Sequence, residues 1–171
     1  MHDHFRMMAH YGRWASERLI TAADALSEAD FHADHGAFFR SLSGTFNHLV
    51  VTDRVWMRRF TGEGPVQTRL DEILTDDRTE LAALRRAEDA RIIAFVETLD
   101  EAALAAPIHY SPLTGPGSFT QPLAPLLAHL FNHQTHHRGQ ATVILTRIGG
   151  RDAAPVLDLV AFQRVSGMGM A

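Results

Sequence analysis

The sequence contains no cysteine and no lysine among its 171 residues. Without cysteine the chain can have no disulfide, no thiolate metal site and no cysteine nucleophile, so histidine, aspartate and glutamate are the candidate metal ligands. Without lysine it can use neither Schiff-base catalysis nor a P-loop lysine. These absences narrow the chemistry to imidazole, carboxylate and guanidinium groups.

Long apolar runs and excess positive charge are also missing. No run reaches the roughly 18 apolar residues that span a bilayer, and residues 1–6 lack the apolar core of a secretory signal, so we expect a cytoplasmic protein without a membrane partner. The net charge of -4 and the pI near 6.2 argue against a nucleic-acid partner. The length predicts a single domain over 1–171.

Apolar residues recur three or four positions apart over most of the chain, which is the helical period. The pattern predicts long helices at about 3–26, 38–61 and 77–99, and a fourth from the prolines at 122 and 125 to the glycines at 149 and 150. A short helix is expected at about 156–165. The polar stretch 27–37 is predicted to be a connection.

The segment 107–122 surrounds a Gly-Pro-Gly turn with alternating apolar residues. It is either a short two-stranded hairpin or an ordered loop, and we favour the hairpin. Four long amphipathic helices with one longer crossing connection predict an all-α fold, a four-helix bundle with a short C-terminal helix. Sites in such bundles lie in the interior, between facing helices.

The most informative stretch is 129–137, which holds four histidines. His133 and His137 fall on the same helical stripe as Leu126, Leu130 and Ile144, where apolar side chains are expected. A buried polar ring without a partner costs roughly 1–3 kcal/mol, so two of them one turn apart need a partner. Histidines at i and i+4 can reach one metal ion, and the alternative is a hydrogen-bonded pair in the core.

A third ligand could come from His48, which lies on the flank of the core face of the second helix. Three neutral imidazoles with an open fourth position are typical of catalytic metal sites, and the open position would hold water, a thiolate or a carboxylate. Spacing alone does not single out His48, which can also be a structural histidine. The other candidates are His10, His109, His129 and His136. Of these, His129 and His136 lie beside the apolar stripe and are expected at the rim of the site.

Two hydrolase classes are poorly supported. The spacing of His133 and His137 resembles the HExxH motif, but Gln134 stands where that motif has its general-base glutamate. No G-x-S-x-G elbow of a serine hydrolase is present. Arg138 directly follows a candidate ligand and either steers an anionic substrate or is an ordinary residue at the core boundary.

The strings LFNHQTHHRGQ at 130–140, FNHLVVTDRVW at 46–56, YGRWASERL at 11–19 and LDLVAFQ at 157–163 resemble the DinB/YfiT-like family of bacterial metalloenzymes. The resemblance implies a four-helix bundle that holds a divalent metal, typically zinc or nickel, through one histidine of the second helix and two of the fourth. These match His48, His133 and His137. The family often has asparagines in its first helix, where this chain has Gly12 and Ser16, so no first-helix role is carried over.

The resemblance also suggests an activity. Some relatives are thiol S-transferases that use a low-molecular-weight thiol such as bacillithiol, mycothiol or glutathione, and others are hydrolases. We therefore expect a metal-dependent enzyme that activates a thiol or water against a small substrate, and a homodimer. The alternative is a non-catalytic metal-binding protein of the stress response. The family name does not imply DNA binding.

Overall fold

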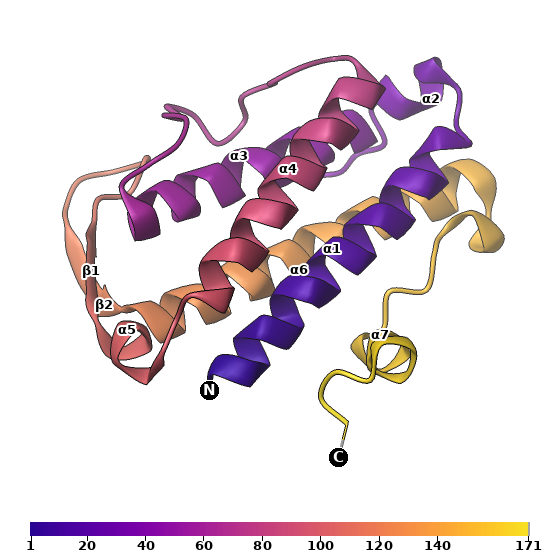
Figure 1. Cartoon of the computed structure of the whole chain (residues 1–171). Helices are drawn as coiled ribbons and strands as arrows, with labels where there is room; N and C mark the ends of the chain where they lie inside the picture. The colour runs from indigo at the N-terminus through magenta and orange to yellow at the C-terminus, as the bar shows by residue number, and fades with distance from the viewer. Residues whose placement is uncertain (171) are drawn as a thin grey trace.

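The computed structural model describes residues 1–170, and four long helices dominate it (Figure 1). These are α1 (His2–Asp24), α3 (Leu42–Thr61), α4 (Arg78–Glu97) and α6 (Leu123–Gly149). Helices α1 and α3 each pack against both α4 and α6. Helices α1 and α6 run in one direction and α3 and α4 in the other (Figure 1). The predicted all-helical bundle is confirmed.

Because α3 and α4 begin at the same end of the bundle, residues 62–77 must return along its length between them (Figure 1). The turn into this crossover uses Gly62, whose φ of 75° is left-handed. At its other end the side chain of Asp77 accepts from the backbone N–H of Glu80 at 2.7 Å and caps α4. Asn47 fastens the crossover to α3, since its Oδ1 accepts from the Leu74 N–H at 2.8 Å. This segment is the longer connection that the sequence predicts.

Two short helices lie where no helix is expected. Stretch 27–37 contains α2 (Glu28–His32), which Ser27 caps and whose Phe31 is fully buried. Helix α5 (Glu101–Ala105) follows α4 and buries Leu104. Each spans about one turn, too short for apolar periodicity to show, and burial of one side chain stabilises it.

The predicted start of the second helix near 38 is wrong, because α3 begins at Leu42. Arg40 has a φ of 67°, which breaks the helical path, and Ser41 caps α3 by accepting from the Gly44 N–H at 2.9 Å. Phe38 and Phe39 therefore belong to a turn ahead of the helix.

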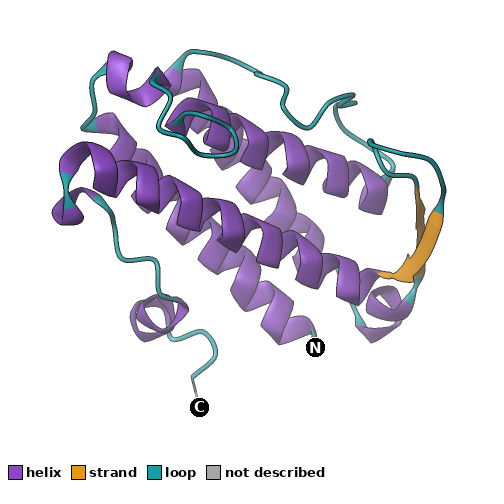
Figure 2. Ribbon diagram, turned by 180° about the vertical axis from the view of Figure 1, so that it is seen from behind, coloured by secondary structure: helices purple, strands orange, loops and turns teal. Residues whose placement is uncertain are grey.

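A hairpin closes one end of the bundle and leads directly into α6. Strands β1 (Pro107–Tyr110) and β2 (Phe119–Pro122) are antiparallel, with Pro107 opposite Pro122, so the hairpin prediction is confirmed. After α6, the turn η1 (Arg151–Ala153) leads to α7 (Leu159–Ser166), which lies outside the four long helices (Figure 2). Phe162 of α7 packs against the ring of Tyr11. None of the described helices is long and apolar enough to cross a membrane.

Candidate metal centre

Three histidine rings from two facing helices converge in the bundle. The Nε2 atom of His48, on α3, lies 3.4 Å from that of His133 and 3.2 Å from that of His137. The two α6 histidines are 3.0 Å apart at the same atoms. Within residues 1–170, these form the one group of three or more His, Asp or Glu side chains close enough to share a metal ion. We call them the histidine cluster.

The spacing of the cluster fits a divalent ion. Zinc–nitrogen bonds of about 2.0–2.1 Å at tetrahedral angles put ligand nitrogens about 3.3 Å apart. The observed separations of 3.0–3.4 Å bracket that value. The three nitrogens are therefore already arranged as the ligands of one ion would be.

Hydrogen bonds at the far side of two rings direct their lone pairs inward. His48 Nδ1 lies 2.7 Å from the carbonyl oxygen of Leu70, so this nitrogen must carry the proton and Nε2 is left with its lone pair. His137 Nδ1 is 2.8 Å from Gln140 Oε1, with the same consequence. No acceptor among the described residues reaches His133 Nδ1. The two lone pairs fixed in this way, on Nε2 of His48 and of His137, lie 3.2 Å apart and repel each other unless a cation lies near both, so the donor set fits a metal.

Burial keeps these rings neutral. Desolvation lowers the pKa of His48 to about 4, opposed by the hydrogen bond with Leu70. Burial, followed by the neighbouring imidazoles of His137 and His48, lowers the pKa of His133 to about 3. The pKa of His137 is also lowered by burial. At pH 7 the cluster therefore presents three neutral imidazoles, the form of the ring that binds a metal.

Phe39 shields the cluster from one side. Its ring stacks on His48 with a centroid distance of 3.7 Å and an interplanar angle of 19°. It also meets His137 edge-on at 5.5 Å. No sequence pattern pointed to this residue, because its contact depends on the turn that precedes α3.

Residues that follow the two α6 histidines point elsewhere. Gln134 Nε2 donates to Asp53 Oδ2 at 2.8 Å, and Arg85 Nη1 contacts the same oxygen at 2.7 Å. Arg85 Nη2 also pairs with Asp89 at 3.0 Å. Arg138 donates to Gln134 Oε1 at 3.3 Å. We call these five buried residues the ion cluster.

The position of Arg138 corrects both sequence interpretations. Its guanidinium is in the interior, 5.0 Å from the Tyr11 ring centroid, and only 4% of the residue is exposed. One residue along a helix is a turn of about 100°, which directs this side chain away from the histidines. Arg138 is neither a substrate-steering residue nor a boundary residue.

The remaining candidate histidines lie outside the cluster. His10 contacts Glu97 at 3.3 Å, and His109 bonds to the hydroxyl of Thr120 within the hairpin at 2.7 Å. His136 and His129 lie at the rim, as expected. The first contacts Gln140 at 3.2 Å, and the second stacks edge-on with Trp56 at 5.0 Å between ring centroids.

Two cavities adjoin the histidine cluster. One of about 400 Å³ is reached by His133, and the other, of about 720 Å³, by His48 and His137. Leu70 and Leu113 line both. A small molecule can therefore reach the cluster through either cavity.

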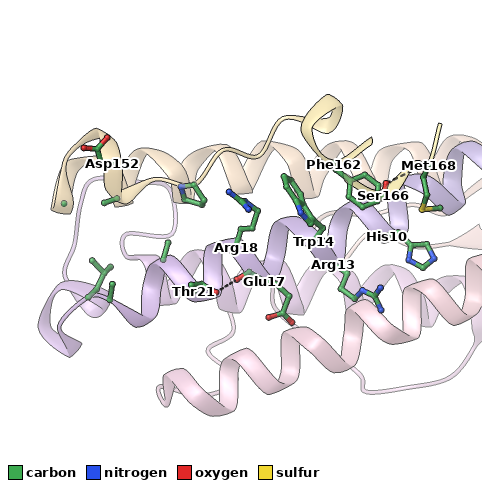
Figure 3. Close-up of a pocket in the computed structure, with 16 residues that line it drawn as sticks. His10, Arg13, Trp14, Glu17, Arg18, Thr21, Asp152, Phe162, Ser166 and Met168 are labelled. Carbon is green, nitrogen blue, oxygen red and sulfur yellow. Dashed lines mark hydrogen bonds between the residues drawn. The ribbon is translucent and has the colours of Figure 1, made fainter. Parts of the chain in front are cut away.

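A larger groove of about 890 Å³ lies between α1 and the C-terminal segment (Figure 3). Figure 3 shows Trp14 of α1 facing Phe162 of α7, with Arg18 next to it on the same side of α1. Two of its charged groups have partners within the protein, since Glu17 pairs with Arg86 at 2.8 Å and Arg18 donates to a backbone carbonyl at 3.0 Å. The metal-ligating group is elsewhere, so the groove is not the candidate centre.

Fold and site together define a mostly helical protein with a three-histidine group that fits a metal ion. The chain belongs to the DinB family, whose model matches residues 1–166. It is 25% identical over 169 residues to Protein DinB of Bacillus subtilis (strain 168). The match covers 95% of this chain and 96% of that protein. It also resembles the crystal structure of a DinB-like protein from Bacillus cereus ATCC 10987. That match has a TM-score of 0.61 at 20% identity, over 79% of this chain and 86% of the other, and supports the fold.

Proposed function

We propose that this protein is a metal-dependent enzyme that activates a thiol or water against a small substrate. In this proposal His48, His133 and His137 hold one divalent ion, zinc or nickel. The observation that carries it is the convergence of three Nε2 atoms, two from buried histidines and one from the partly buried His133, within 3.0–3.4 Å of one another. Three imidazoles leave a fourth position for a reactant, as in catalytic rather than structural zinc sites.

The chain's own residues prepare the site for that chemistry. The carbonyl of Leu70 and the side chain of Gln140 fix two of the rings, and Phe39 covers one side of His48. When bound, the ion supplies Lewis acidity that lowers the pKa of a coordinated thiol or water. Gln134 is an amide, which cannot act as a general base, and its side chain is turned to Asp53, so a peptidase of the HExxH type is not supported.

A non-catalytic metal-binding protein of the stress response is the alternative. Such a protein would be expected to seal its metal inside the bundle. Two cavities reach the three histidines from outside, and one of them is also lined by Arg59. An accessible site with a cation in the same cavity supports an enzyme.

The test is turnover by the metal-loaded protein. We expect it to accelerate either conjugation of a low-molecular-weight thiol to chlorodinitrobenzene, as a transferase, or hydrolysis of an activated ester, as a hydrolase. The activity should disappear in His133→Ala and survive in His136→Ala. Stoichiometric metal without either activity across a panel of such substrates would favour the non-catalytic alternative.

The family resemblance also supports a homodimer. We propose that two copies associate in solution, which light scattering would show as a mass of about twice the 19.0 kDa of one chain. A mass that stays at one chain across concentrations would contradict this.

A further inference from the structure

A row of side chains joins the histidine cluster to Arg59 along the cavity of about 400 Å³. The ring centroids of His133 and His129 are 5.9 Å apart, and those of His129 and Trp56 are 5.0 Å apart. The guanidinium of Arg59 lies 4.4 Å from the centroid of Trp56 and 5.0 Å from that of Tyr110. The cavity therefore has the histidine cluster at one end and a cation at the other.

Arg59 is half-buried and lacks a carboxylate partner among the residues that the structure describes. Its Nη2 donates to the backbone carbonyl of Ser111 at 2.8 Å, which leaves donors of the guanidinium unused. The lining of this cavity includes no aspartate or glutamate. Burial lowers the pKa of Arg59, so the charged group is held there at a cost that an anion would offset.

The neighbouring cavity provides the contrast. Its arginine, Arg69, is paired with Asp71 through two contacts of 3.0 and 2.8 Å and needs no further anion. Both cavities reach the histidine cluster, but only the one at His133 carries an arginine without a carboxylate partner among residues 1–170. The cavity at His133 therefore has an arginine whose charge no described carboxylate balances. In the cavity at His48 and His137, Asp71 balances the charge of Arg69.

We propose that Arg59 binds the anionic group of a small acid whose reactive end reaches the histidine cluster. This rests on the proposed function and names its substrate class, a molecule with a carboxylate or similar anion at one end and a thiol or electrophile at the other. The Arg59 guanidinium lies over the rings of Trp56 and Tyr110, whose centroids are 5.3 Å apart. The N–H donors that the Ser111 carbonyl does not use suit a carboxylate.

The helix geometry sets the shape of that molecule. Arg59 is eleven residues after His48 on α3, which returns it to nearly the same face of the helix about 16 Å further along its axis. The long arginine side chain shortens this span. The ligand is therefore elongated, and an anion as short as acetate could not occupy both ends.

The test compares two thiols of matched length, 6-mercaptohexanoic acid and 6-mercaptohexanol, titrated calorimetrically into the metal-loaded protein. Because a hydrogen-bonded charge pair is worth about tenfold or more in affinity, we expect the acid to bind at least about tenfold more tightly. Arg59→Met should remove the preference and Arg59→Lys should keep part of it. Arg69→Met is the matched control and should leave the preference unchanged.

The outcomes separate the two proposals. Equal binding of acid and alcohol by the wild type, or an acid preference that survives in Arg59→Met, overturns the role of Arg59. Failure of both thiols to bind overturns the role of Arg59 and the thiol-transfer form of the proposed function, whose hydrolytic form is decided by the ester assay. Metal content is measured on each sample, and a wild type that takes up no metal but prefers the acid contradicts the proposed function alone. Thermal melting of Arg59→Met checks that the variant is folded.

Discussion

Two polar clusters share helix α6, and they differ in how their burial is balanced. His133 and His137 belong to the histidine cluster, while the residues that follow them, Gln134 and Arg138, belong to the ion cluster. The ion cluster contains groups of opposite charge. The histidine cluster contains three groups of the same kind, and no described carboxylate joins it.

In the ion cluster the opposing charges neutralise one another. Burial raises the pKa of Asp53 to about 6, and the charge of the Arg85 guanidinium opposes that shift. Asp89 gives Arg85 a second acidic partner at 3.0 Å. The histidine cluster instead places three ring nitrogens within 3.0–3.4 Å of one another and has no cation of its own. Three ring nitrogens that converge in this way indicate a cation supplied from outside the chain.

The largest expected effect comes from removing the cation of the ion cluster. Arg85→Met leaves Asp53 and Asp89 buried without their partner, which should lower the free energy of unfolding by about 3–5 kcal/mol. Urea denaturation of the metal-free protein measures this. The matched control is Arg86→Met, because Arg86 is exposed and pairs with Glu17 at the surface, where loss of the pair costs about 1 kcal/mol or less. If both variants lost a similar free energy of unfolding, the charges of the ion cluster would not depend on Arg85 for their balance.

Acid should act on the histidine cluster. In the unfolded chain each ring titrates near 6.5, whereas in the fold the pKa is about 4 for His48 and about 3 for His133. Between these values the unfolded chain binds protons that the folded chain does not. The contribution of these two rings to the free energy of unfolding is therefore fully present above pH 6.5. It is lost as the pH falls from 6.5 toward their pKa values in the folded protein.

We expect a loss on the order of 2 kcal/mol in the metal-free protein, because solvent reaches part of the His133 ring and screens its charge. The metal-loaded protein should lose more, since protons also displace the ion. Melting temperatures between about pH 7.5 and 5, with and without chelator, measure both effects. Metal-free His133→Ala should show a flatter profile, and an unchanged profile would mean that this ring does not titrate as described.

A smaller effect is expected from Gln140, which orients His137 through a contact of 2.8 Å. Groups that hold a ligand ring contribute about 10- to 100-fold to metal affinity, and Gln140→Ala should fall near tenfold because it contacts one ring of three. His136→Ala removes the other side chain that Gln140 contacts and should change affinity little. Competition with a chromogenic chelator measures both. Equal losses would indicate that His136 also supports the site.

Much of this arrangement could be predicted from the sequence, for reasons that differ between residues. His133 and His137 stood out because the i, i+4 spacing and the apolar stripe are properties of one helix. His48 was one of several candidates by spacing, because its partners are 85 and 89 positions away and meet it only in the tertiary structure. Its match to the DinB family pattern supplied what spacing could not.

Other features required the packed structure. The sequence does not predict that Arg138 is buried, because periodicity shows which residues share a helix face. It does not show whether the neighbouring face is also covered by other helices. Helices α2 and α5 are too short to show a period. Phe39 and Arg59 act through contacts between elements. Only for Arg59 did the sequence hold a signal, its position eleven residues after His48 on one helical face.

The central claim is that the histidine cluster binds one divalent metal ion, and the metal content of purified protein tests it most directly. After loading with zinc or nickel and removal of excess, elemental analysis should find about one ion per wild-type chain. The content should be near zero in His133→Ala and in His137→Ala, and close to the wild-type value in His136→Ala. Retention of the metal in both ligand variants, or its absence from the loaded wild type, would contradict the claim.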